Sequence, residues 1–290
     1  MSDYYGLPLL KPPVWTWEVP AYFFVGGAAG AAAVIAAAAR LSGGRDDLVR
    51  DARWIAAVGG AIAPPLLIAD LGRPERFLNM LRVFKLQSAM SVGAWTLVAF
   101  SNAAAASAGA DLLERATNGS VPVRVIGNIA EALAAASGLV LSTYTGVLIG
   151  ATAIPAWSEN VKVLPVHFGA SGVGAAVSIL ELLGHRDRAL NVLGAGAAAV
   201  ETLIGASFEL RQSDALVPLK DDWTGAVTRM GGVLSGPLPL ALRLLAGRLP
   251  SARKAAAVST MMGSLMTRVG WLAAGKCSIE ESQKAFVRSS

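Results

Sequence analysis

The sequence predicts an all-α integral membrane protein with eight transmembrane helices. Of its 290 residues, 54% are hydrophobic and only 16% are charged, whereas soluble domains carry about 25% charged residues. The uncharged residues also gather in long runs instead of being spread evenly. This composition excludes a water-soluble enzyme, an extracellular disulfide scaffold and a disordered chain.

Eight apolar runs each approach the roughly 20 residues that a helix needs to cross a hydrocarbon core about 30 Å thick. Gly236, Pro237 and Pro239 interrupt the seventh run, so we expect a kinked or broken helix there. We expect a single domain over residues 1–290, with an interfacial helix between the second and third spans. The eight runs and their grouping are: 19–39, 53–71, 90–109 and 124–147 in a first four-helix bundle (1–150); 163–183, 189–209, 231–247 and 253–274 in a second (151–275); and a tail at 276–290.

The basic residues predict the orientation in the membrane. The net charge is +5, but most Lys and Arg lie in short connectors, which favours membrane topology over nucleic-acid binding. The odd-numbered connectors hold eleven basic residues. The opposite side holds five once the 72–89 loop and the tail are set apart. We therefore expect a multi-pass protein of the cytoplasmic membrane with both termini outside.

The connector between the second and third spans departs from the pattern. Asp70 ends the second run, Gly72 can turn the chain, and Pro74 suits the first position of a new helix. Residues 74–84 would then form an interfacial helix whose apolar stripe holds Phe77, Leu78, Leu81 and Phe84. An aspartate that merely caps the helix or pairs with Arg73 fits this spacing equally well.

Three segments together resemble the polysulfide reductase membrane-subunit (NrfD/PsrC-like) family. They are residues 15–27, the Asp70–Pro74 loop with residues 88–95, and residues 144–150 followed by Pro155-Ala156-Trp157. The resemblance covers residues 15–160. It implies a quinone-reactive membrane anchor with a quinone pocket among the first four spans, near the outer surface. It also implies two partners, a ferredoxin-like four-cluster iron–sulfur subunit and a molybdopterin catalytic subunit.

A quinone site needs hydrogen-bond donors and a titratable group, because the reaction moves two electrons and two protons. Tyr144 lies three residues from the outer end of its span, about 5 Å deep, and its phenol both donates and accepts. Asp70 lies at a matching depth and could relay protons while Arg73 keeps it ionised. Trp17 and Glu18 would close the site at the first span, where some relatives carry asparagine or histidine. Tyr144 as an interfacial anchor and Glu18 as an exposed helix start are the alternatives.

Ionisable residues inside the membrane are candidates for a proton path. We expect Glu131, Glu181 and Glu201, with Arg243 as the only cation at comparable depth, to carry protons from the inner side towards Tyr144. The alternative is a structural ion pair between Arg243 and either Glu201 or Glu131. Arg268, near the outer end of the last span, is expected to extend its charge to the interface.

The cofactor expected is a quinone, with menaquinone favoured by the resemblance. Cys277 is the single cysteine, so an iron–sulfur cluster belongs on another chain. His167 and His185 are separated by about 27 Å of helix, so they cannot ligate one haem iron. A metal site is not expected. A proton-coupled transporter and a purely structural anchor are the alternative functions.

Overall fold

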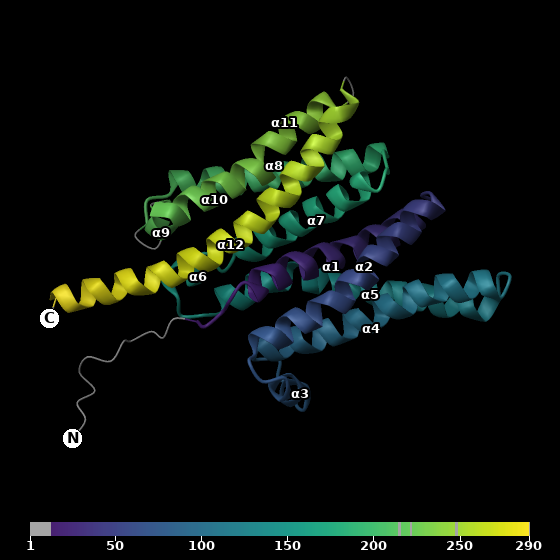
Figure 1. Cartoon of the computed structure of the whole chain (residues 1–290), viewed down its shortest axis with the longest axis horizontal. Helices are drawn as coiled ribbons and strands as arrows, with labels where there is room; N and C mark the ends of the chain where they lie inside the picture. The colour runs from purple at the N-terminus through teal and green to yellow at the C-terminus, as the bar shows by residue number, and fades with distance from the viewer. Residues whose placement is uncertain (1–12, 214–215, 221, 247–248, 290) are drawn as a thin grey trace.

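The computed structural model describes residues 13–213, 216–220, 222–246 and 249–289, and every regular element in these ranges is a helix (Figure 1). The long helices are α1 (Glu18–Leu41), α2 (Asp46–Asp70), α4 (Ala89–Ala116), α5 (Val121–Gly150), α7 (Leu164–Leu182), α8 (Arg188–Leu210) and α12 (Pro250–Ser289). The shorter ones are α3 (Glu75–Leu81), α6 (Pro155–Ser158), α9 (Val217–Lys220), α10 (Asp222–Ser235) and α11 (Pro237–Leu245). The predicted all-helical fold is confirmed.

Six helices are long and apolar enough to cross a membrane, namely α1, α2, α4, α5, α7 and α8. They coincide with the first six predicted runs, so the chain is a multi-pass membrane protein. The seventh run corresponds to α10 and α11, and the eighth lies within α12. That these last elements also cross the membrane stays a prediction.

The break in the seventh run is confirmed at Gly236, which separates α10 from α11 with φ −106° and ψ −99°. Residue 247, the last of that run, lies outside the described residues. Residues 276–289, which the sequence analysis sets apart as a tail after the last span, continue α12 as far as Ser289. Residues 276–289 contain neither glycine nor proline, so nothing in them stops the helix. Residue 290 lies outside the described residues.

Helix α1 lies at the centre of the packing and contacts α2, α5 and α7 (Figure 1). Helix α4 packs on α5 and α2, and α12 packs on α7, α10 and α11. The backbones of α1 and α5 touch directly, since a Cβ atom built on Gly30 would lie 2.4 Å from the carbonyl oxygen of Gly138. Such close approach is how small residues associate helices without a hydrophobic driving force.

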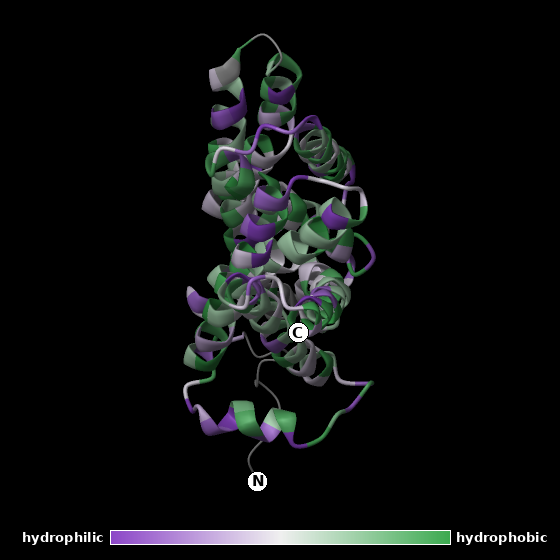
Figure 2. Cartoon of the chain, turned by 90° about the vertical axis from the view of Figure 1, so that its right-hand side faces the viewer, coloured by the Kyte–Doolittle hydropathy of each residue, from purple (hydrophilic) through white to green (hydrophobic). Residues whose placement is uncertain are grey.

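Helix α3 is shorter than the predicted interfacial helix. Figure 2 shows it as the lowest helix, with hydrophilic and hydrophobic residues side by side. Phe77 is buried, but the neighbouring Leu78 is 69% exposed. Phe84 lies beyond the helix end and meets Trp95 edge-on, with ring centroids 6.2 Å apart. The predicted single stripe is therefore divided between the protein core and the surface.

Candidate functional site

Tyr144 on α5 is buried, with 5% of its surface exposed. Its hydroxyl donates a hydrogen bond to the backbone carbonyl of Ala89, the first residue of α4. Gly93, one turn further along α4, faces the phenol ring: a Cβ atom built there would lie 2.1 Å from Cε1 of Tyr144. The missing side chain at Gly93 therefore makes the room that the tyrosine ring occupies.

A small cavity of about 20 Å³ adjoins this phenol. Its lining is apolar apart from the tyrosine hydroxyls, and consists of Tyr22, Leu67, Met80, Met90, Gly93, Ala94, Tyr144 and Leu148. This volume holds about one water molecule. A phenol in an apolar wall suits a carbonyl acceptor, but the ring of a quinone fits only if neighbouring side chains move. Met80 and Met90 can do so, because methionine is unbranched and flexible.

Asp70, at the end of α2, lies against the segment that precedes α1. Its Oδ1 accepts a hydrogen bond of 3.3 Å from the backbone N–H of Thr16, whose hydroxyl donates to Glu18. The predicted pairing with Arg73 is wrong: no ion pair joins the two described side chains, and Arg73 is exposed. Gly72, with φ +67°, turns the chain between them.

The structure therefore brings Asp70 and Glu18 together but puts neither in the lining of the cavity beside Tyr144. Trp17, also predicted for this site, is 69% exposed and does not line that cavity.

An aromatic cluster that sequence reasoning missed ties the same end of α1 to α12. Trp15 stacks on Trp157, with ring centroids 5.4 Å apart. Nε1 of Trp157 donates to the carbonyl of Trp271 over 2.8 Å, and Nζ of Lys276 donates to the carbonyl of Trp15. The segment before α1 and the last long helix thus meet at one end of the molecule. In the sequence, the motif Pro155-Ala156-Trp157 was the one feature that drew attention to Trp157, and it did not indicate which residues Trp157 contacts.

Glu131 is buried near the opposite end of the bundle, where two arginines hold it. Nε of Arg40 donates to its carboxylate over 2.6 Å, and Arg53 pairs with both Glu131 and Asp111. The prediction that Arg243 is the only cation at this depth is wrong. The predicted second run begins at Arg53, whereas helix α2 begins earlier, at Asp46, so Arg53 lies within the helix and its side chain reaches Glu131.

Arg243 pairs with Glu181. Its Nη1 donates to Oε1 of Glu181 over 2.8 Å, and both side chains are fully buried. Nε of Arg253 lies 3.9 Å from the same carboxylate. The predicted pairing of Arg243 with Glu201 or Glu131 is therefore wrong, because its side chain reaches Glu181 on α7 instead.

Glu201 belongs to a third cluster. It accepts a hydrogen bond of 2.8 Å from Ser235, and its Oε1 lies 3.4 Å from Nδ1 of His167. His185, the other histidine, contacts Asp51 over 2.9 Å. The two histidines thus take part in separate clusters.

Arg268 does not extend to the interface, so that prediction is wrong too. It is fully buried, and its Nη1 donates to the hydroxyls of Ser171 and Ser264 over 2.8 and 2.6 Å. Its guanidinium carbon lies 5.4 Å from the centre of the Phe168 ring. The residue faces α7 and α1 from α12, where a Cβ atom on Gly27 would come within 2.9 Å of its Nη2.

Among the described side chains, no hydrogen bond or ion pair links the clusters of Glu131, Glu181 and Glu201. A continuous route through them to Tyr144 stays a prediction. The described residues also contain no group of three His, Cys, Asp or Glu side chains arranged to hold a metal ion.

Comparison with known proteins gives one family. The family model described as "Polysulphide reductase, NrfD" matches residues 9–189, which is more than half of the chain. No curated protein matches the sequence. The matched range includes Tyr144, Asp70 and α1 to α7.

Proposed function

Because this chain belongs to the polysulphide reductase, NrfD, family, we propose that it is the membrane subunit of a quinone-linked reductase. In this proposal it exchanges electrons with a ferredoxin-like four-cluster iron–sulfur subunit, which is attached to a molybdopterin catalytic subunit. A quinone, with menaquinone favoured, supplies the two-electron, two-proton chemistry. The partners' own redox groups complete the electron path.

The observation that carries the proposal is the buried phenol of Tyr144 beside an apolar cavity. Its hydroxyl now donates to the carbonyl of Ala89. By rotating about its Cζ–Oη bond it can donate instead to an acceptor in the cavity, and so orient a quinone carbonyl. Movement of Met80 and Met90 would enlarge the space, and Met90 is already 47% exposed.

Asp70 and Glu18 are the groups we propose for proton exchange with water at this end. They are close enough to share Thr16 as a hydrogen-bond partner. Asp70 is partly exposed and can exchange protons with solvent, whereas Tyr144 is shielded from it. Under the predicted orientation this end faces outward, with both termini outside and with α10–α11 and α12 as the last two spans of a cytoplasmic-membrane protein.

The test is Tyr144→Phe in the assembled complex. We expect quinol turnover to fall about 100-fold, the size of effect seen when one preorganised donor is removed from an active site. Thr143→Val is the matched control, because it removes a hydroxyl from the neighbouring residue of α5, and we expect its turnover to be unchanged. Native gel electrophoresis would check assembly. Full turnover by an intact Tyr144→Phe complex would contradict the proposal and favour a structural anchor.

Proton conduction is a second candidate function, favoured by one observation in the C-terminal part. Glu201 is 2% exposed yet lines a cavity of about 370 Å³ between α8, α10 and α11. Its contact with His167 gives a buried pair through which a proton could pass. Glu201→Gln in proteoliposomes should abolish proton movement coupled to quinol oxidation while turnover continues. Unaltered proton movement would exclude this role.

A further inference from the structure

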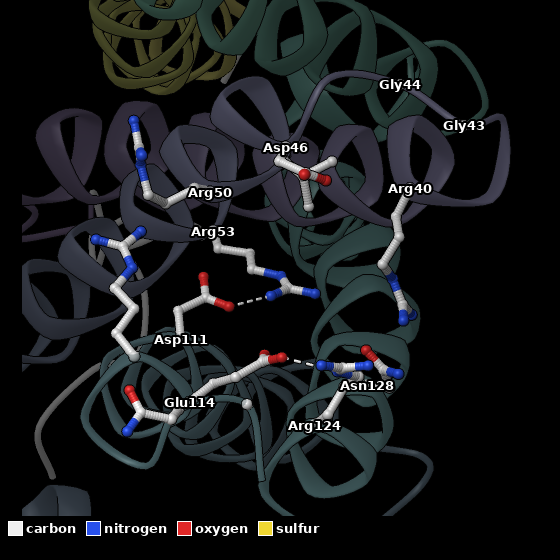
Figure 3. Close-up of a pocket in the computed structure, with 14 residues that line it drawn as sticks. Arg40, Gly43, Gly44, Asp46, Arg50, Arg53, Asp111, Glu114, Arg124 and Asn128 are labelled. Atoms are coloured by element: carbon white, nitrogen blue, oxygen red, sulfur yellow. Dashed lines mark hydrogen bonds and ion pairs between the residues drawn. The ribbon is translucent and has the colours of Figure 1, made fainter. Parts of the chain in front are cut away.

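A cavity of about 870 Å³ lies at the ends of α1, α2, α4 and α5, at the opposite end of the bundle from Tyr144 (Figure 3). Its lining is polar and contains five arginines: Arg40, Arg50, Arg53, Arg115 and Arg124. Three carboxylates, two asparagines and three glycines complete most of it: Asp46, Asp111, Glu114, Asn118, Asn128, Gly43, Gly44 and Gly119. Its size is that of pockets that hold drug-sized molecules, about 300–1,000 Å³.

The ion pairs around this cavity leave many guanidinium donors unused. Arg40, Arg50 and Arg124 each donate through Nε alone, to Glu131, Asp51 and Glu114 respectively. Within the described residues their Nη atoms make no hydrogen bond. A guanidinium has five N–H donors, of which four are on Nη1 and Nη2.

Arg115 adds a further donor. It is exposed at the cavity and makes no ion pair with any side chain that the structure describes. Arg53, by contrast, has all three of its side-chain nitrogens in contact with carboxylates, Nη1 with Asp111 (Figure 3) and Nε and Nη2 with Glu131. When Glu131 and Asp51 are counted, positive and negative groups around the cavity balance. Its attraction for an anion therefore depends on the free donors of Arg40, Arg50, Arg115 and Arg124, not on net charge.

The helices that carry these arginines expose apolar side chains directly beside them. On α4, Leu112 and Leu113 are 51% and 57% exposed. On α5, Val125, Ile126 and Ile129 are 49%, 61% and 57% exposed. Such side chains suit contact with acyl chains. The cavity thus lies where the arginine-rich ends of membrane-spanning helices meet a lipid-facing surface.

We propose that this cavity binds the phosphate group of an anionic phospholipid. Arginine forks match phosphate oxygens in bidentate geometry, and basic pockets between transmembrane helices on the cytoplasmic side are suited to anionic headgroups. The predicted orientation places these arginine-rich connectors on the cytoplasmic side. The volume exceeds the needs of a lone phosphate and accommodates the attached glycerol. This site is separate from the quinone site, so either can be correct without the other.

The test compares two charge-matched double variants of the full chain. Arg115→Gln with Arg124→Gln removes two cavity arginines. Arg186→Gln with Arg188→Gln removes two exposed arginines, one just before α8 and one at its first position, and neither lines the cavity. Binding of phosphatidylglycerol to the detergent-purified protein would be measured by native mass spectrometry. At about 1 kcal/mol per arginine near a membrane surface, the cavity variant should bind about 30-fold more weakly, and the control variant as the wild type does.

Two further binding measurements distinguish an anionic phospholipid from free phosphate as the ligand. Phosphatidylcholine, which has no net charge, should bind the wild type much more weakly than phosphatidylglycerol. Inorganic phosphate at millimolar concentration should not displace the bound lipid. Equal phosphatidylglycerol binding by both double variants would overturn the site. Displacement by inorganic phosphate would overturn the lipid as the source of the phosphate group. Circular dichroism of each variant would verify folding. Phosphatidylglycerol binding by Arg115→Gln alone would be measured as well, because this substitution breaks no ion pair among the described side chains and should still weaken binding.

Discussion

Arg243 of α11 donates a hydrogen bond from Nη1 to Oε1 of Glu181 of α7 over 2.8 Å, and neither side chain has any exposed surface. Gly194 of α8 makes space for this pair, since a Cβ atom there would lie 2.4 Å from Cζ of Arg243. The pair joins α11, which is separated from α10 by the break at Gly236, to a long apolar helix. Removal of one partner would leave the other as an uncompensated buried charge.

Glu181→Gln should therefore lower the free energy of unfolding by about 3–5 kcal/mol, which is the usual cost of breaking a buried ion pair. Thermal unfolding in detergent, followed by circular dichroism, would measure it. Glu209→Gln is the matched control, because Glu209 pairs with Arg229 at the surface and should cost less than about 1 kcal/mol. Equal losses in the two variants would show that burial of the Glu181 pair has no energetic consequence.

Gly93→Ala should impair the candidate quinone site without harming helix α4. Alanine is a better helix former than glycine, but its Cβ would lie 2.1–2.4 Å from Cε1, Cζ and Oη of Tyr144. The phenol must then move away from Ala89. We expect quinol turnover to fall by about the same factor as in Tyr144→Phe. Gly109→Ala, with nothing within 4 Å of the new Cβ, is the control on the same helix. If both variants kept full turnover, the position of the phenol would not matter to the reaction.

Arg268→Lys should destabilise the protein although it keeps the positive charge. A lysine ammonium cannot reproduce the planar fork, in which Nη1 donates to Ser171 and Ser264 and Nη2 donates to the carbonyl of Phe168. The cost should be about 1–3 kcal/mol, the range for hydrogen-bonding groups left unsatisfied inside a protein. Chemical denaturation in detergent would measure it, with the exposed Arg82→Lys as control. A stability equal to that of the wild type would mean that charge alone is needed at this position.

Trp157→Phe should loosen the contact between the segment before α1 and α12. The substitution removes the Nε1–H bond to the carbonyl of Trp271 and part of the stacking surface for Trp15. We expect faster amide hydrogen exchange at residues 15–19 and a stability loss of about 1–3 kcal/mol. Trp223→Phe, at a side chain that is 60% exposed, should change neither quantity. Unchanged exchange in Trp157→Phe would show that the aromatic cluster does not hold this segment.

The membrane-spanning helices could be predicted from the sequence because each is one long apolar run, and the break at Gly236 because glycine and proline interrupt its run. The partners of the buried charges could not. Hydropathy does not tell which way a helix is turned about its axis. Arg243 and Glu181 are 62 positions apart, and Arg53 and Glu131 are 78 apart. Such pairs are decided by which helices pack together.

The sequence motifs single out Tyr144 as a candidate, but they do not predict which residues surround it. The motif that begins α4 contains Gly93, but only the packing of α4 on α5 shows that the tyrosine ring needs that glycine. Asp70 was expected to meet Arg73, three positions away. The chain turns at Gly72, and Asp70 instead accepts a hydrogen bond from the backbone N–H of Thr16, in the segment before α1.

The environment of Arg268 also determines where the protein can be truncated. Gly27, Phe168 and Ser171 lie inside the stretch that the family model matches, whereas Arg268 and Ser264 lie beyond it. A polypeptide cut after position 189 would keep Gly27, Phe168 and Ser171 but lose Arg268, which packs against them. The hydroxyl of Ser171 and the ring of Phe168 would then be exposed to hydrocarbon. Truncated or chimaeric proteins that carry only residues 9–189 should therefore be unstable unless another helix replaces α12.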